Sequence, residues 1–164
     1  MFTSHDKASF FKTLLFVLKS FFSYHFSFKT KCQHIGKNPK LWGVWNIELY
    51  GKNISFGDNV TIVAADGYKT HLTCYRAGPY HGKISIGNNV LVMNGVRISS
   101  ASEIIIHDDC MLANFCYITD ADWHDVYDRT KSPGKTSPII LQKGAWIGDS
   151  AIICKGVTVG ENSI

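Results

Sequence analysis

Large apolar residues recur every six positions along most of the chain beyond Gly51. The segments ISFGDN, ISIGNN and VTVGEN share one order of residue types: aliphatic, small, apolar, glycine, an acid or asparagine, and asparagine. AWIGDS and IIIHDD are looser copies of it. The alternating apolar residues predict a short strand, and the glycine–asparagine step predicts a tight turn, because Gly and Asn tolerate positive φ. Each six-residue unit is therefore predicted to be one strand followed by one corner.

Three such units predict one triangular coil, and stacked coils share a continuous core. We expect an all-β fold of this kind, a parallel β-helix, over residues 47–164. The positions expected to point inward are all large and apolar: Phe56, Ile62, Ile86, Val92, Ile98, Ile106, Leu112, Ile118, Leu141, Ile147, Ile153 and Val159. Two segments, near 64–83 and 119–138, break the repeat and are predicted to be extruded loops, where function concentrates.

A basic, aromatic-rich arm, residues 1–46, precedes the repeat. Residues 1–47 carry seven lysines and one acid, whereas the rest of the chain carries ten Lys/Arg against twelve Asp/Glu. Residues 10–28 predict an amphipathic helix, too short and too interrupted by lysine for a membrane span. Two roles stay open: peripheral contact with an anionic membrane through residues 1–31, or packing on the domain or between subunits. No nucleic-acid partner is expected.

The five cysteines form no CxxC pair, and no secretion signal is evident. Free thiols in a reducing cytoplasm fit this pattern, and it suggests no zinc or other metal. We therefore expect a cytoplasmic protein, with the inner face of the cytoplasmic membrane as the place where the arm would dock.

Two segments resemble a known family. WIGDSAIICKGVTVGENS, residues 146–163, resembles the signature of sugar O-acetyltransferases in the hexapeptide-repeat superfamily, and DADWHDVYDR, residues 120–129, resembles their active-site loop. The resemblance covers residue 47 to the C-terminus. It implies a left-handed coil, against the usual handedness of parallel crossovers. It also implies acetyl-CoA as co-substrate, a sugar or glycan acceptor, and a homotrimer with its active site between adjacent subunits.

Acetyl transfer to a hydroxyl needs a base that takes the hydroxyl proton, and a histidine with a near-neutral pKa suits that role. His124 lies in the second predicted loop among several aspartates, of which Asp122 or Asp125 could orient the ring. The resemblance adds Trp146, Ala151 and Lys155 as acetyl-CoA contacts and Asn114 as an acceptor contact. Aromatic and arginine groups often contact sugars, so the first loop adds a further acceptor-side set: Tyr75, Arg76 and Tyr80.

These residues predict an O-acetyltransferase that acts on a surface glycan or its lipid-linked precursor. The main alternative is a truncated, non-catalytic scaffold, because the resemblance implies at least one more coil and the chain looks C-terminally incomplete. Serine O-acetyltransferase is less favoured, since that family carries a long helical N-terminal domain. A γ-class carbonic anhydrase is also less favoured, because the histidines lack the short pair that its zinc site requires: His71, His81, His107 and His124.

Overall fold

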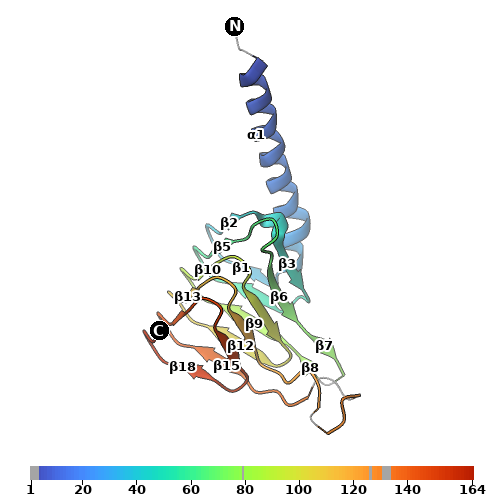
Figure 1. Cartoon of the computed structure of the whole chain (residues 1–164), viewed down its shortest axis with the longest axis vertical. Coiled ribbons are helices and arrows are strands. Elements are labelled where there is room, and N and C mark those ends of the chain that lie inside the picture. The colour runs from blue at the N-terminus through green and yellow to red at the C-terminus, as the bar shows by residue number, and fades with distance from the viewer. Residues whose placement is uncertain (1–3, 79, 126, 131–133) are drawn as a thin grey trace.

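The computed structural model describes residues 4–164 except 79, 126 and 131–133. Residues 1–3 of the arm and these parts of the two predicted loops therefore lie outside the described residues. The chain folds as a left-handed parallel β-helix with three sheets around one core, and a long helix projects from the first coil (Figure 1). This confirms the predicted fold class.

Each complete coil contributes one strand to each sheet, and the last strand of the chain adds one more to sheet A. Sheet A runs β1 (His34–Ile35), β4 (Ile54–Phe56), β9 (Lys83–Ile86), β12 (Glu103–Ile106), β15 (Ile139–Leu141) and β18 (Thr158–Val159). Sheet B runs β2 (Lys40–Trp42), β5 (Thr61–Val63), β10 (Leu91–Val92), β13 (Met111–Leu112) and β16 (Trp146–Ile147). Sheet C runs β3 (Ile47–Tyr50), β6 (Thr70–Cys74), β11 (Arg97–Ser100), β14 (Tyr117–Thr119) and β17 (Ile152–Cys154).

The predicted inward positions form three columns, one per sheet, because parallel pairing keeps them in register. In sheet A, Phe56 pairs with Ile86, and Ile106 with Leu141, which in turn pairs with Val159. All predicted positions up to Ile147 are buried, and Ile153 and Val159 in the last coil are partly buried against the same cluster. The six-residue spacing thus identified the core.

The corners owe their shape to asparagine and glycine in two different ways. Asn59 and Asn89 have left-handed backbones, with φ of 57° and 56°. Their side chains also stack: Asn59 Nδ2 donates to Asn89 Oδ1 at 3.1 Å. Gly87 does not need positive φ; a Cβ there would lie 2.4 Å from Asp108 Oδ1 of the next coil. Glycine is therefore required by the close approach of stacked coils, and asparagine by the turn.

Two features differ from the prediction. The first coil begins at His34, ahead of the predicted boundary at residue 47, so residues 34–46 belong to the β-helix and include a 3₁₀ turn, η3 (Val44–Asn46). The segment near 64–83 is not one loop. It contains β6, whose Leu72 is fully buried, followed by an antiparallel hairpin of β7 (Arg76–Ala77) and β8 (Tyr80–His81).

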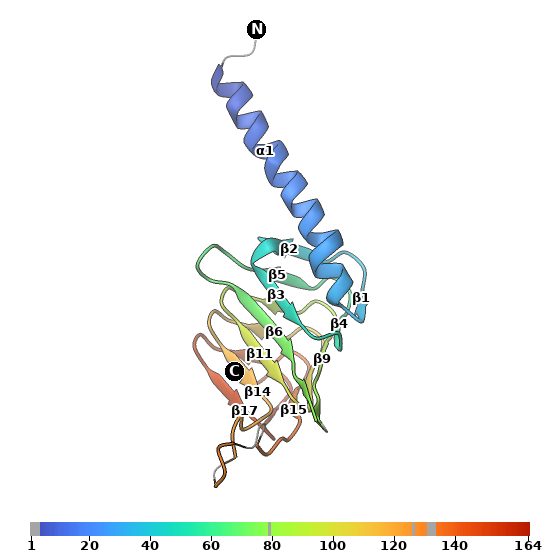
Figure 2. The ribbon, with the colours of Figure 1, turned by 90° about the vertical axis from the view of Figure 1, so that its right-hand side faces the viewer.

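The arm consists of α1 (Ser4–Phe22), a π-helical segment η1 (Ser23–Phe28) and a 3₁₀ turn η2 (Lys29–Lys31). Phe28 is buried and its ring lies 5.4 Å from that of Phe56, so η1 closes the first coil. α1 extends away from the coil (Figures 1 and 2). It touches the domain at Trp45, whose ring lies 5.2 Å from Phe16 and 4.2 Å from the Lys19 ammonium. No described helix is both long enough and apolar enough to cross a bilayer.

Candidate active site

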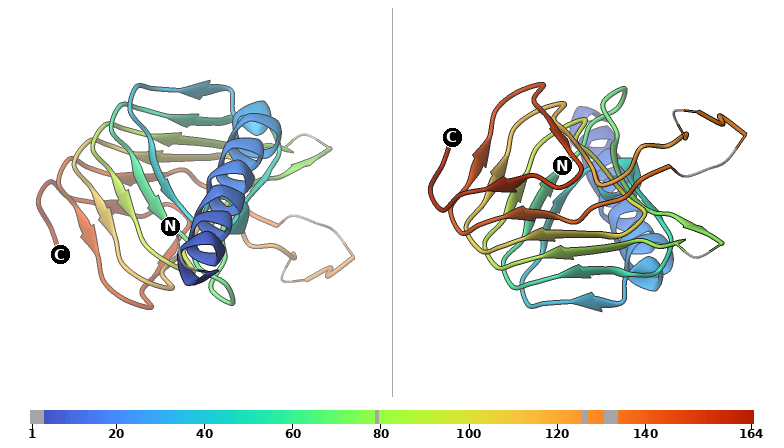
Figure 3. Two further views of the ribbon diagram at one scale, coloured as in Figure 1. Left: turned by 90° about the horizontal axis from the view of Figure 1, so that it is seen from above. Right: turned by 90° about the horizontal axis from the view of Figure 1, so that it is seen from below.

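Both insertions leave the coil at the same corner, between sheets C and A. The β7–β8 hairpin follows β6, and the segment between β14 and β15 follows two coils later; both project on one side of the molecule (Figure 3). The corner between β11 and β12 lies between them: Ser100 ends β11, and Ala101 and Ser102 follow it. These extra residues account for the phase slip between Ile98 and Ile106.

Asp120 anchors the second loop, although it is a fully buried carboxylate. Its Oδ1 accepts from Ala101 N–H at 2.7 Å, and its Oδ2 accepts from Ser102 N–H at 2.9 Å and from the Ser100 hydroxyl at 2.7 Å. Its carbonyl accepts from Ser137 N–H at 3.0 Å, which joins the start of the loop to its end. Charge-assisted bonds of this kind are the strong ones, so both ends of the loop are fixed to the coil.

Trp123 fixes the next part of the loop to sheet C. Its indole Nε1 lies 3.1 Å from the Tyr117 hydroxyl and 3.0 Å from Thr119 Oγ1. Tyr75, at the foot of the hairpin, packs edge-on against Trp123 with ring centroids 5.4 Å apart. The two insertions therefore touch through their aromatic side chains, and the residue after Trp123 is held at a defined place.

That residue is His124, which is exposed at a hollow of about 280 Å³. The hollow is lined by Asp122, His124, Asp125, Tyr127, Lys135 and Lys155. Lys155, at the end of β17, reaches the loop: its Nζ lies 2.8 Å from Asp122 Oδ1. His124, two aspartates and two lysines thus share one concave surface, which suits a base acting beside developing negative charge.

The two aspartates predicted to orient His124 have other partners. Asp122 pairs with Lys155, and Asp125 Oδ1 accepts from the backbone N–H groups of Tyr127 and Asp128 at 2.8 and 2.9 Å. In the described part of the chain neither carboxylate is hydrogen-bonded to the His124 ring. Asp122 and Asp125 therefore surround the base, and their role in orienting it stays a prediction.

The predicted acetyl-CoA contacts are spread over the last complete coil. Trp146 lies on the outer face of sheet B, paired in register with Met111, and both side chains are partly exposed. Ala151 lies at the corner between β16 and β17, and Lys155 lies after β17 in the His124 hollow. The structure thus brings Lys155, and not Trp146, beside His124.

The predicted acceptor contacts also lie in two places, only one of which is near His124. Tyr75 packs on Trp123, and Arg76 and Tyr80 lie on the adjoining hairpin, so these three are close to the loop of His124. Asn114 lies at the corner between sheets B and C, where its carbonyl accepts from Ser150 N–H at 2.9 Å. Its buried Oδ1 has no partner among the described residues. This position is that of a turn residue, away from the hairpin.

Sequence reasoning missed Asp120, Trp123 and Tyr117. Asp120 is one of several acids near His124, and no one-dimensional pattern marks it as buried. Trp123 had a usable signal, since a tryptophan directly before a candidate base is large enough to fix the loop.

Comparisons with known proteins find two acetyltransferases at low identity. No family model and no solved structure matches the chain. The chain is 26% identical over 137 residues to the polysialic acid O-acetyltransferase of Neisseria meningitidis, which covers 77% of this chain and 60% of the relative. It is 29% identical over 89 residues to a probable acetyltransferase of Mycobacterium tuberculosis, which covers 52% of this chain and 29% of the relative. The chain therefore matches less than two thirds of either relative's length.

Proposed function

We propose that this chain, as a member of the hexapeptide-repeat acetyltransferase family, transfers an acetyl group from acetyl-CoA to a sugar hydroxyl. The proposal rests on one observation: a loop that is anchored through Asp120 and Trp123 places His124 at a hollow. An incidental surface histidine would not need such a support.

In the proposed reaction His124 takes the proton of the acceptor hydroxyl as its oxygen attacks the thioester carbonyl. A tetrahedral oxyanion forms, and Lys155 in the same hollow supplies positive charge beside it. The intermediate then collapses: the carbon–sulfur bond breaks, and the coenzyme A thiolate leaves and receives the proton from the His124 imidazolium. The products are the O-acetyl sugar and coenzyme A.

The donor would lie along the last coils, with Trp146 and Ala151 beside it and Lys155 at its thioester end. A partly exposed tryptophan next to Met111 offers an apolar surface to the coenzyme. For the acceptor, the Neisseria relative is named for O-acetylation of polysialic acid. We extend this to the chain as an acidic surface glycan or its lipid-linked precursor, within polysaccharide biosynthesis.

An acetyl-transfer assay with an acceptor panel tests the proposal. The protein is incubated with acetyl-CoA and oligosialic acid, neutral oligosaccharides or free serine, and thiol release and labelled acetyl transfer are followed. Acetylation of a sugar is the expected result. Acetylation of serine alone would indicate a serine O-acetyltransferase, and no transfer to any acceptor would favour the non-catalytic scaffold.

We also propose that three chains assemble, with Trp146 and Met111 of sheet B among the residues near the subunit boundary. Both are large side chains left partly exposed on a sheet face. Sedimentation equilibrium should give three times the mass of one chain, and a monomer mass at micromolar concentration would contradict the trimer.

The arm is proposed to bind an anionic membrane surface. Phe11, Leu15 and Phe22 fall on one face of α1 at helical spacing and are each more than half exposed, with values of 61%, 64% and 55%. Lys29 and Lys31 follow at the base of the arm, and each lysine near an anionic surface adds about 1 kcal/mol.

The intact chain should sediment with phosphatidylglycerol vesicles at low salt and less so at high salt. Leu15→Gln combined with Phe22→Gln should abolish sedimentation, while Lys143→Gln on the domain should not. Removing residues 1–30 is a poorer test, because it deletes Phe28 from the core. An intact chain that ignores the vesicles would make α1 a packing helix.

A further inference from the structure

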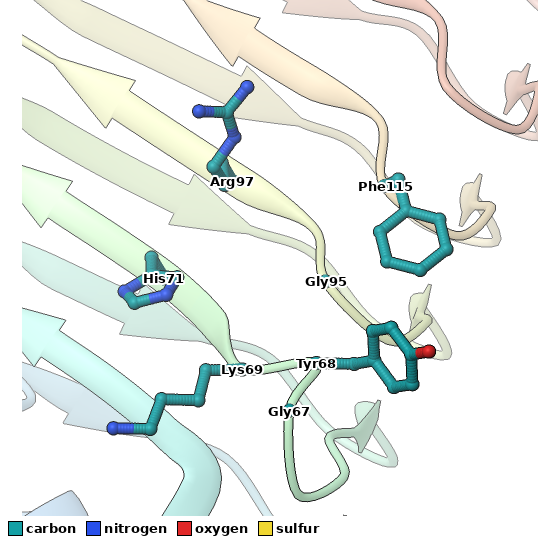
Figure 4. Close-up of a pocket in the computed structure, with 7 residues that line it drawn as sticks. All are labelled: Gly67, Tyr68, Lys69, His71, Gly95, Arg97 and Phe115. Atoms are coloured by element: carbon teal, nitrogen blue, oxygen red, sulfur yellow. The ribbon is translucent and has the colours of Figure 1, made fainter.

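A second hollow lies on sheet C, apart from the one that holds His124. It measures about 480 Å³ and is lined by Gly67, Tyr68, Lys69, His71, Gly95, Arg97 and Phe115 (Figure 4). Gly95 is part of its construction, because a Cβ there would lie 2.5 Å from the Phe115 ring. Its floor is built from β6 and β11, where His71 and Arg97 are paired in register with their side chains outward.

The charge in this hollow is unevenly compensated. Glu48 on β3 lies 2.6 Å from Lys69 Nζ and 3.2 Å from His71 Nδ1, so both groups have an acidic partner. Arg97 has no acidic partner among the residues that the structure describes. Its guanidinium instead lies 4.3 Å from the centre of the Tyr117 ring. Such a guanidinium keeps its fork of N–H donors available, and that fork matches a carboxylate.

One wall of the hollow is aromatic. Tyr68 and Phe115 meet edge to face with ring centroids 5.4 Å apart, and their side chains are 54% and 44% exposed. Flat apolar rings next to an uncompensated cation suit a ligand that has both an apolar face and a negative charge. A carboxylated sugar ring has both.

Tyr117 connects this hollow to the candidate base. It is paired in register with Arg97 and stacks under the Arg97 guanidinium, while its hydroxyl accepts from Trp123 Nε1. Trp123 directly precedes His124. A glycan that lies along sheet C would therefore contact Arg97 with one residue and reach the loop of His124 with another.

We infer that the hollow over β6 and β11 is a subsite for a carboxylated sugar residue of the acceptor, adjacent to the residue that is acetylated. Arg97 binds the carboxylate, and Tyr68 and Phe115 pack against the ring. This inference rests on the proposed function and adds to it a binding place on sheet C for a second, carboxylated residue of the acidic acceptor.

The test compares Arg97→Gln and Lys69→Gln with Lys83→Gln. Lys83 is a matched control: like Lys69, it is 49% exposed and pairs with a glutamate, Glu103, but it lies on sheet A. Initial rates are measured with oligosialic acid and with the same oligomer after its carboxylates are reduced to alcohols. Loss of a hydrogen-bonded charge pair predicts about a tenfold or larger rise in KM for Arg97→Gln. That rise should occur with the carboxylated oligomer only, with kcat unchanged.

Equal losses with both oligomers, or equal effects of Arg97→Gln and Lys83→Gln, would overturn the subsite. Binding of oligosialic acid by calorimetry, without acetyl-CoA, separates this outcome from failure of the proposed function. If the chain binds the oligomer through Arg97 but transfers no acetyl group, the subsite is supported and the proposed function is wrong. If the chain acetylates neutral sugars and does not distinguish the two oligomers, the proposed function is supported and the subsite is wrong.

Discussion

The strongest stability prediction concerns the buried carboxylate of Asp120. Asp120→Ala removes the acceptor for three donors at once: Ala101 N–H, Ser102 N–H and the Ser100 hydroxyl. The two N–H groups belong to a corner of the coil and cannot turn toward water without moving the backbone.

The magnitude follows from these three contacts. Hydrogen bonds to charged groups contribute about 1.5–3 kcal/mol each, and a buried donor left without a partner costs about 1–3 kcal/mol. Two effects offset part of this loss. The variant has no carboxylate to remove from water on folding, and water can enter the vacated space. We expect Asp120→Ala to lower the free energy of unfolding by about 4 kcal/mol. Asp120→Asn keeps one acceptor for Ala101 N–H, so its loss should be smaller, about 2 kcal/mol.

The assay is urea and thermal unfolding of both variants beside Asp149→Asn, an exposed acid at another corner. For a chain of this size, about 4 kcal/mol corresponds to a fall in Tm of roughly 10 °C. Asp149→Asn should stay within about 0.5 kcal/mol of the parent. If Asp120→Ala unfolds at the same urea concentration as Asp149→Asn, the buried network does not hold the loop, and the support for His124 must lie elsewhere.

Three further predictions concern the core and the thiols. Leu72→Ala should lower the free energy of unfolding by about 2–5 kcal/mol, since Leu72 is fully buried in β6, and a loss of less than about 1 kcal/mol in urea unfolding would contradict its place in the core. Burial raises the pKa of Cys74 and Cys116 from 9.0 to about 12, so mass spectrometry after iodoacetamide treatment of the native protein at neutral pH should find Cys154 modified and these two unmodified. Because the unfolded chain loses these thiol protons near pH 9.0 while the folded chain keeps them, stability should fall as pH rises from 9.0 toward about 12, and a flat stability over that range would contradict the shift.

The sequence predicted the coil well because its information is local. Each inward position must be apolar, and each corner needs a residue that accepts a left-handed backbone, so every strand marks its own place. The first coil was missed although HIGKN, residues 34–38, has the same Ile-Gly-x-Asn step, and Asn38 has a φ of 53°. The aromatic run before it made the whole region resemble part of the arm.

The candidate site was only partly predictable. His124 was predictable because it lies among several aspartates in DADWHDVYDR, the segment that resembles the active-site loop of the family. Asp120 could not be identified, since its burial depends on the corner at Ser100–Ser102 one coil earlier. The hollow at Arg97 was also hidden: its lining residues come from three coils, and only parallel register brings them together. Such contacts depend on the stacking of coils and not on any one repeat.

The proposed role of His124 as the base for acetyl transfer is tested by the turnover of His124→Ala with acetyl-CoA and a sugar acceptor. Removing a general base costs about 10²–10⁴ in rate. We expect a loss of that size in kcat, with acetyl-CoA affinity and the unfolding midpoint unchanged, since His124 is exposed. Turnover within a few-fold of the parent protein would contradict it and remove His124 from the mechanism.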